Sequence, residues 1–145
     1  TSKVNCDVQD PTLGPSTVSC IATVDNNSIK PARGLQLFLS NFGPGEGATA
    51  PPNVWKPVSK SVTLQIQALP AKCNRAMLTS IDDKVSNPFQ TFLDMGSPQY
   101  LSDTQLSQLH EASKPSQQEI EVIDGKFDVI LQPYGVAHIQ FASCY

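Results

Sequence analysis

The sequence predicts a mainly β fold, a single-domain antiparallel β-sandwich of about eight strands with two short inserted helices. Short segments in which apolar and polar residues alternate recur along the chain, as in strands that bury one face. Turn signals rich in the 12 prolines and 8 glycines separate these segments. The length of 145 residues is that of one ordinary domain, so residues 1–145 are expected to form one sandwich.

The alternation is clearest in residues 61–69, where Val62, Leu64 and Ile66 are separated by polar residues. Further along, Asp124-Gly125 lies between two apolar segments, which is typical of a two-residue type I′ turn. Residues 42–57 are rich in Gly, Pro and Ala and are predicted to form a long loop. The remaining strands are expected at residues 4–8, 17–24, 35–40, 75–81, 119–123, 126–132 and 136–142.

A first short helix is predicted after the strand at residues 75–81. Asn87 is a capping residue type, Pro88 favours the first helical position, and Gly96 ends the segment. Apolar residues at i, i+3 and i+4 predict a buried stripe on this helix. The stripe consists of Phe89, Phe92 and Leu93.

A second short helix is predicted to begin at Ser102, which forms a capping box with Gln105. Leu101 is expected to contact Leu106 across this box, and residues 113–115 end the helix before the next strand. The side chains predicted to face inward are those of Leu106, Leu109 and Ala112.

The charge balance excludes several partners. The chain has 10 Lys and Arg against 13 Asp and Glu, so it has no basic surface to neutralise phosphates, and nucleic acid is not expected as a partner. No apolar run approaches the roughly 20 residues needed to cross a bilayer, so no membrane span is predicted. No cofactor is expected either.

Cys6, Cys20, Cys73 and Cys144 form an even set in a chain that begins with Thr1 rather than Met. No two of them form a C-x-x-C pair and no histidine is near them in sequence, which does not favour a zinc site. Among the three pairings, Cys6–Cys20 and Cys73–Cys144 are favoured because the first closes a local turn and the second ties down the last strand. Buried free thiols are the alternative.

Other features are typical of secretion. Asn26-Asn27-Ser28 is an N-glycosylation sequon in a polar stretch, and Asn26 is its acceptor. The sequence lacks a signal peptide, as in a mature chain from which one was removed. The expected location is therefore extracellular.

Short motifs occur in series over about 80 residues of the chain. They are Val62-Thr63-Leu64-Gln65-Ile66, Ile81-Asp82, Ser86-Asn87-Pro88 and Met95-Gly96-Ser97-Pro98. Together they resemble the C-terminal β-sandwich accessory domain that follows the catalytic barrel in glycoside hydrolase family 39, the α-L-iduronidase and β-xylosidase family. The resemblance implies a secreted accessory sandwich without its enzyme, since the family's two catalytic glutamates lie on the barrel.

No catalytic or metal-binding group is predicted. Glu119 and Glu121 alternate on one strand face beside a turn, which is typical of a solvated edge. His110 is expected on the exposed side of the second helix and His138 on the wet face of the last strand. The three aspartates that could suggest calcium, Asp82, Asp83 and Asp94, lack the spacing of a calcium loop, and Asp82 is expected to hydrogen-bond the following turn.

Exposed aromatic side chains on loops commonly hold sugars by stacking, with nearby amides as hydrogen-bond partners. Trp55, Tyr100 and Tyr134 have these positions, and the amide side chains expected to assist are Asn41, Asn53 and Gln99. The alternative for Trp55 is a structural role in which it closes one end of the sandwich.

The leading hypothesis is a secreted, non-catalytic, lectin-like protein whose partner is a glycan. The alternative is a structural or protein-interaction domain that self-associates, or binds a protein, through the face left by a missing catalytic barrel. A third hypothesis is a domain cut from a larger enzyme, although the chain from Thr1 to Tyr145 with its even cysteine set favours a complete protein.

Overall fold

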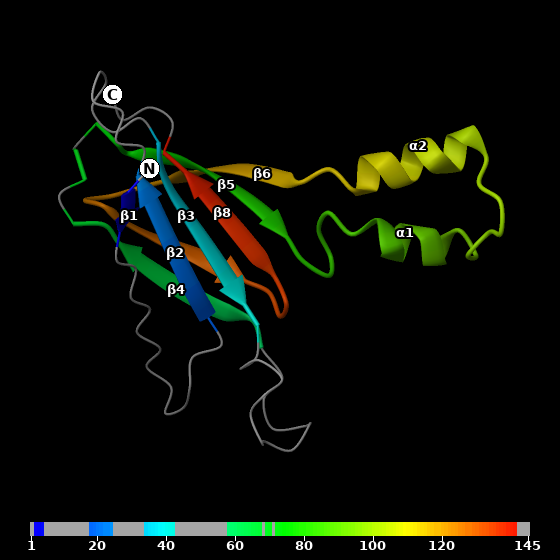
Figure 1. The fold of residues 1–145 in the computed structure, drawn as a ribbon, viewed down its shortest axis with the longest axis horizontal. Coiled ribbons are helices and arrows are strands. Elements are labelled where there is room, and N and C mark those ends of the chain that lie inside the picture. The colour runs from blue at the N-terminus through cyan, green and yellow to red at the C-terminus, as the bar shows by residue number, and fades with distance from the viewer. Residues whose placement is uncertain are drawn as a thin grey trace, which may run out of the picture.

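The computed structural model of the chain describes residues 2–4, 18–24, 34–42, 58–67, 69–70 and 72–141. These residues form eight strands and two helices (Figure 1), which confirms the predicted mainly β class. The strands are β1 (Ser2–Val4), β2 (Val18–Val24), β3 (Leu35–Asn41), β4 (Lys60–Gln65), β5 (Arg75–Ile81), β6 (Ser116–Glu121), β7 (Lys126–Leu131) and β8 (Val136–Gln140). The helices are α1 (Pro88–Asp94) and α2 (Asp103–Ala112).

The strands form two antiparallel sheets. The larger has six strands in the order β1-β2-β3-β8-β5-β6, and the smaller consists of β4 and β7. In Figure 1 the two-stranded sheet lies behind the six-stranded one. Since one cluster of buried side chains includes residues of both sheets, the sheets pack face to face as the two layers of a sandwich.

The core lies between the two layers. Leu39 and Ile139 from the six-stranded sheet and Val129 and Leu131 from the two-stranded sheet are almost completely buried. Burial of a side chain of this size stabilises the fold by about 1.5–3 kcal/mol. The alternation read from the sequence is confirmed in β4, where Val62 and Leu64 are buried and the residues between them exposed.

Asp124-Gly125 forms the predicted tight turn, with both residues at positive φ and backbone hydrogen bonds exchanged between Ile123 and Lys126. However, the strands that flank the turn belong to different sheets, because β6 pairs with β5 and β7 pairs with β4. The turn therefore carries the chain from one layer of the sandwich to the other.

The two helices form an insertion in the β5–β6 hairpin, and residues 82–115 are called the arm below. Figure 1 shows α1 and α2 side by side, extending away from the sandwich. The predicted caps are confirmed: the Asn87 side chain accepts a hydrogen bond from the Phe89 N–H, and Ser102 and Gln105 form a complete capping box. Local signals therefore determine where both helices begin.

The predicted burial of the helices is wrong. Neither α1 nor α2 has a buried residue, and Phe89 and Leu106 are 64% and 54% exposed. The reason is that, within the described chain, each helix packs mainly against the other. Only one stripe of each helix can be covered in such a pair, so Leu93 and Leu101 are exposed as well, while Phe92, Leu109 and Ala112 are half-buried.

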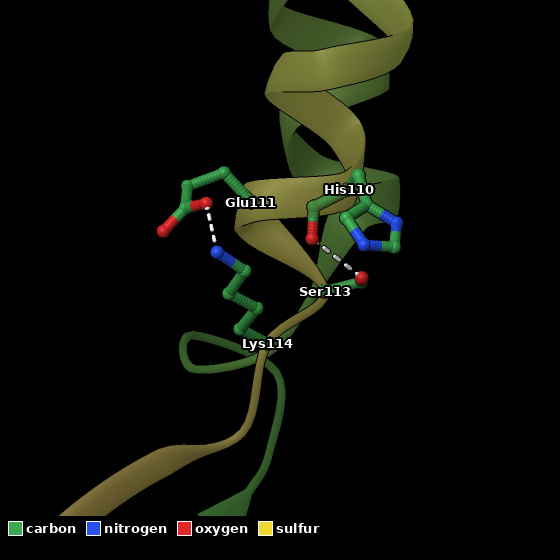
Figure 2. Close-up of polar contacts among 4 residues, drawn as sticks. All are labelled: His110, Glu111, Ser113 and Lys114. Atoms are coloured by element: carbon green, nitrogen blue, oxygen red, sulfur yellow. Dashed lines mark hydrogen bonds and ion pairs between the residues drawn. The ribbon is translucent and has the colours of Figure 1, made fainter.

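The end of α2 is held by local contacts (Figure 2). The Ser113 hydroxyl donates to the His110 carbonyl at 2.7 Å, and the Lys114 ammonium forms an ion pair with Glu111. His110 is exposed, as predicted. Among the described residues, no helix is long and apolar enough to cross a membrane.

Candidate functional site

Two exposed aromatic side chains meet at one end of the sandwich. Phe42 follows β3 directly, and Tyr134 lies in the turn between β7 and β8. Their rings are arranged edge to face with centroids 6.2 Å apart. Phe42 is 47% exposed and Tyr134 is 59% exposed, so the aromatic pair presents a large apolar surface to solvent.

The backbone beneath the pair is fixed by Asn41, which is completely buried. Its side-chain amide donates to the carbonyl oxygens of Val58 at 2.8 Å, Leu131 at 3.3 Å and Gln132 at 3.1 Å. One side chain thus ties the end of β3 to the start of β4 and the end of β7. The suggested role of Asn41 in assisting a ligand is therefore wrong, because its amide hydrogens are used inside the fold.

The turn that carries Tyr134 is also constrained. The Tyr134 N–H donates to the Asn41 carbonyl, and the Asn41 N–H donates to the Gly135 carbonyl. Tyr134 has a φ of 56°, which costs a non-glycine residue about 1–2 kcal/mol. The surrounding hydrogen bonds hold this backbone conformation, and with it the place from which the Tyr134 side chain projects.

The arm begins beside this aromatic pair. Ile81, the last residue of β5, is in register with Val136, which follows the Tyr134 turn. The Asp82 carboxylate accepts hydrogen bonds from the N–H groups of Lys84 and Val85, both at 2.8 Å, which confirms its predicted role in the turn. In the described part of the chain, no three His, Cys, Asp or Glu residues are grouped as a metal site.

The structure separates the aromatic residues predicted as one class. Tyr134 is at the sandwich end, whereas Gln99 and Tyr100 lie in the connection between α1 and α2, at the far tip of the arm in Figure 1. Trp55 and Asn53 lie outside the described residues. Tyr100 and Tyr134 are therefore on different parts of the molecule.

Phe42 was missed because the long loop was predicted to begin there. Leu35, Leu37, Leu39 and Asn41 point to the inner side of β3, so the alternation continued by one residue would have placed Phe42 outward. This signal was available in the sequence.

Cys20 and Cys73 are both disulfide-bonded. Cys6 and Cys144 lie outside the described residues, and so does Asn26. The pairing of the cysteines and the glycosylation of Asn26 therefore stay predictions.

The glutamates and histidines considered above are placed on outer surfaces. Glu119 is exposed and pairs with Arg75 at 2.8 Å across β5 and β6. The half-buried His138 stacks on Phe38 with ring centroids 4.4 Å apart, and its Nε2 lies 3.1 Å from Gln36 Oε1. This stack marks a second aromatic surface, on the outer side of the six-stranded sheet, that the sequence analysis did not identify.

Comparison with known proteins gives one family. Residues 3–126 match the model of glycosyl hydrolases family 39. No match was found among curated protein sequences.

Solved structures of similar fold include two β-xylosidase structures from Caulobacter crescentus and a GH39 enzyme of Xanthomonas axonopodis pv. citri. The GH39 β-xylosidase of Caulobacter crescentus matches with a TM-score of 0.59 and 15% identity over 84% of this chain. The monomeric β-xylosidase of strain CB15 matches with 0.60 and 15% over 87%, and the Xanthomonas enzyme with 0.52 and 14% over 86%. At this identity the similarity shows a shared fold, and the matched regions are 22%, 26% and 26% of those longer chains.

Proposed function

Because the chain belongs to glycosyl hydrolase family 39, we propose that it acts as a non-catalytic carbohydrate-binding module. In this proposal it corresponds to the C-terminal accessory sandwich of the family, is secreted, and binds a glycan at the Phe42–Tyr134 pair. This chain spans about a quarter of the length of the similar β-xylosidases. The proposal therefore does not assign their catalytic activity to it.

The single observation that carries the proposal is the exposed aromatic pair on a fixed backbone. Sugars present an apolar ring face that packs well on aromatic side chains, and a ring already held in position loses little conformational entropy on binding. The Asn41 hydrogen bonds and the Tyr134 turn supply this rigidity. Xylose-containing oligosaccharides are the first ligands to test, since two similar structures are described as β-xylosidases.

The test is calorimetric titration of the protein with xylo-oligosaccharides, after a screen on a broad glycan array. We expect Tyr134→Ala to weaken binding about 10-fold, which corresponds to the loss of about 1.4 kcal/mol of ring stacking. Phe42→Ala should have an effect in the same direction.

Tyr100→Ala is the matched control, since Tyr100 is an even more exposed tyrosine (85% against 59% for Tyr134) and lies at the tip of the arm. It should bind like the parent protein. Unchanged affinity in Tyr134→Ala, or an array on which no glycan binds, would contradict the proposal. Loss of binding only in Tyr100→Ala would move the site to the arm.

The protein-interaction hypothesis remains a second candidate. The observation that favours it is the exposed Phe38, which stacks on His138 on the outer side of the six-stranded sheet.

A further inference from the structure

A row of side chains continues from the Phe42–Tyr134 pair along the outer side of the six-stranded sheet. Cross-strand pairs of β3 and β8 follow one another on this side, two residues apart along each strand. The row is called the outer ladder below, and none of its members is Asp, Glu, Lys or Arg. It consists of the aromatic pair and, in order from it, Ser40–Val136, Phe38–His138 and Gln36–Gln140.

The outer ladder contains a second aromatic pair. Phe38 and His138 are stacked with ring centroids 4.4 Å apart, and Phe38 is 42% exposed. Phe38 and Phe42 are separated along the chain by a distance of about 13 Å in an extended strand. A single sugar ring is much shorter than this distance, so only a chain of several sugar units can contact both aromatic pairs.

Polar groups lie between and beside the two aromatic pairs. The Ser40 hydroxyl is on the step between them, and Gln36 and Gln140 are in register on the step beyond Phe38. Gln36 Oε1 lies 3.1 Å from His138 Nε2, whereas the Ser40 hydroxyl and the Gln140 amide make no hydrogen bond to another residue that the structure describes. These two groups are therefore available to the hydroxyl groups of a ligand.

Charged residues are present on this side of the sheet at its β5–β6 edge. β8 ends at Gln140, which is in register with Met77 of β5. Arg75 lies two residues before Met77 and forms an ion pair with Glu119 of β6 at 2.8 Å, and Glu121 is in register with Arg75. The outer ladder thus has no cation of its own for an anionic sugar, and the residues beyond its end do not supply an excess of positive charge. This arrangement favours a neutral ligand.

The composition of the outer ladder suits a sugar chain. A sugar ring has an apolar face that packs on aromatic side chains, and hydroxyl groups at its edge that need hydrogen-bond partners. Along the outer ladder, aromatic pairs alternate with pairs that carry a hydroxyl or amide group. In Figure 1 this side of the sheet faces the viewer and the arm extends sideways, so no element of the described chain covers β3 and β8.

We propose, on the basis of the function proposed above, that the glycan is a linear, neutral oligosaccharide that lies along β3 and β8 on the outer ladder. One part of the sugar chain packs on the Phe42–Tyr134 pair, and another part packs on the exposed Phe38 beside His138. The hydroxyl and amide groups of the ladder bind the sugar hydroxyls between and beyond these contacts. The affinity of the protein therefore increases with the length of the ligand.

The test is calorimetric titration of the whole chain with xylobiose and with xylohexaose or, if the array identifies another neutral glycan, with its disaccharide and hexasaccharide. The parent protein should bind the long ligand about 10-fold more tightly than the short one, because only the long ligand contacts both aromatic pairs. Phe38→Ala should weaken binding of the long ligand about 10-fold and leave binding of the short one unchanged. Tyr134→Ala should weaken binding of both ligands.

Ile130→Ala is the control, because Ile130 is 66% exposed on the outward side of the two-stranded sheet, and it should bind both ligands like the parent. Equal affinity of the parent for the two lengths would overturn the proposal. Unchanged affinity of Phe38→Ala for the long ligand, or a preference of the parent for an anionic chain, would overturn it too. If circular dichroism shows that Phe38→Ala does not fold, the same comparison in Gln140→Ala decides, since Gln140 is exposed at the far end of the ladder.

The two proposals fail separately. If Tyr134→Ala weakens binding but the length of the ligand and Phe38 have no effect, the glycan binds at the Phe42–Tyr134 pair alone and the outer ladder is not part of the site. If Tyr134→Ala has no effect on either ligand, the proposed binding site itself is wrong.

Discussion

The sandwich and the arm are stabilised by different kinds of interaction. The sandwich has a continuous core to which both sheets contribute, whereas α1 and α2 have no buried residue. Helices of 7 and 10 residues are too short to be stable in isolation, so capping and local hydrogen bonds matter more in the arm than in the sandwich. Destabilising substitutions in the sandwich should therefore lower the free energy of global unfolding, whereas those in the arm should affect only the local stability of the helices.

The largest effect is expected from Asn41→Ala in the sandwich. This change leaves three buried or half-buried carbonyl groups without their donor, and we expect a loss of about 3 kcal/mol in the free energy of unfolding. Chemical denaturation measures it. The control is Asn74→Ala, an exposed asparagine that should change stability by less than about 0.5 kcal/mol. Equal stability of the two variants would mean that Asn41 does not hold the sandwich end.

A smaller effect is expected from Gly125→Ala in the turn that joins the sheets. An added Cβ would lie 2.4 Å from the Ile66 carbonyl oxygen, and the φ of +75° is unfavourable for alanine, so we expect a loss of about 2 kcal/mol. Gly96→Ala in the arm is a matched control, because Gly96 has a φ of +83° with open space around it.

The control should cost about 1 kcal/mol through its backbone conformation alone, and only within the arm. The excess in Gly125→Ala measured by thermal unfolding therefore reports the steric clash in the sandwich. If both variants lose the same global stability, the turn has relaxed and the arm is coupled to the sandwich.

The features predicted correctly from the sequence depend on neighbouring residues. Ser102 and Gln105 are three positions apart, and Asp124 and Gly125 are adjacent, so the capping box and the turn could be recognised directly. The role of Asn41 could not, because its amide contacts carbonyl groups 17 and 90 positions away. Such partners are determined only by the packing of the two sheets.

The apolar stripes of the two helices show a second limit of prediction from the sequence. Periodicity correctly groups side chains on one face of a helix, but it does not reveal whether another element covers that face. Phe89 and Leu106 were expected to be buried, yet the insertion extends away from the sandwich and leaves them exposed. The same holds for β3, where Phe38 is 42% exposed between the buried Leu37 and Leu39, and alternation alone does not show whether another element covers it.

The smallest effect is expected from a change in the N-terminal cap of α2. Ser102→Ala removes the hydroxyl that accepts the Gln105 N–H, which should cost α2 about 1 kcal/mol. Because α2 packs mainly on α1, this loss should appear as about 5-fold faster hydrogen exchange of α2 amides, with the global unfolding midpoint unchanged. Ser107→Ala is the control, since the Ser107 hydroxyl donates to the Asp103 carbonyl within the helix and contributes no cap. A drop in global stability equal to the local loss would show that arm and sandwich unfold as one unit, and the arm would then be part of the cooperative fold despite its lack of a core.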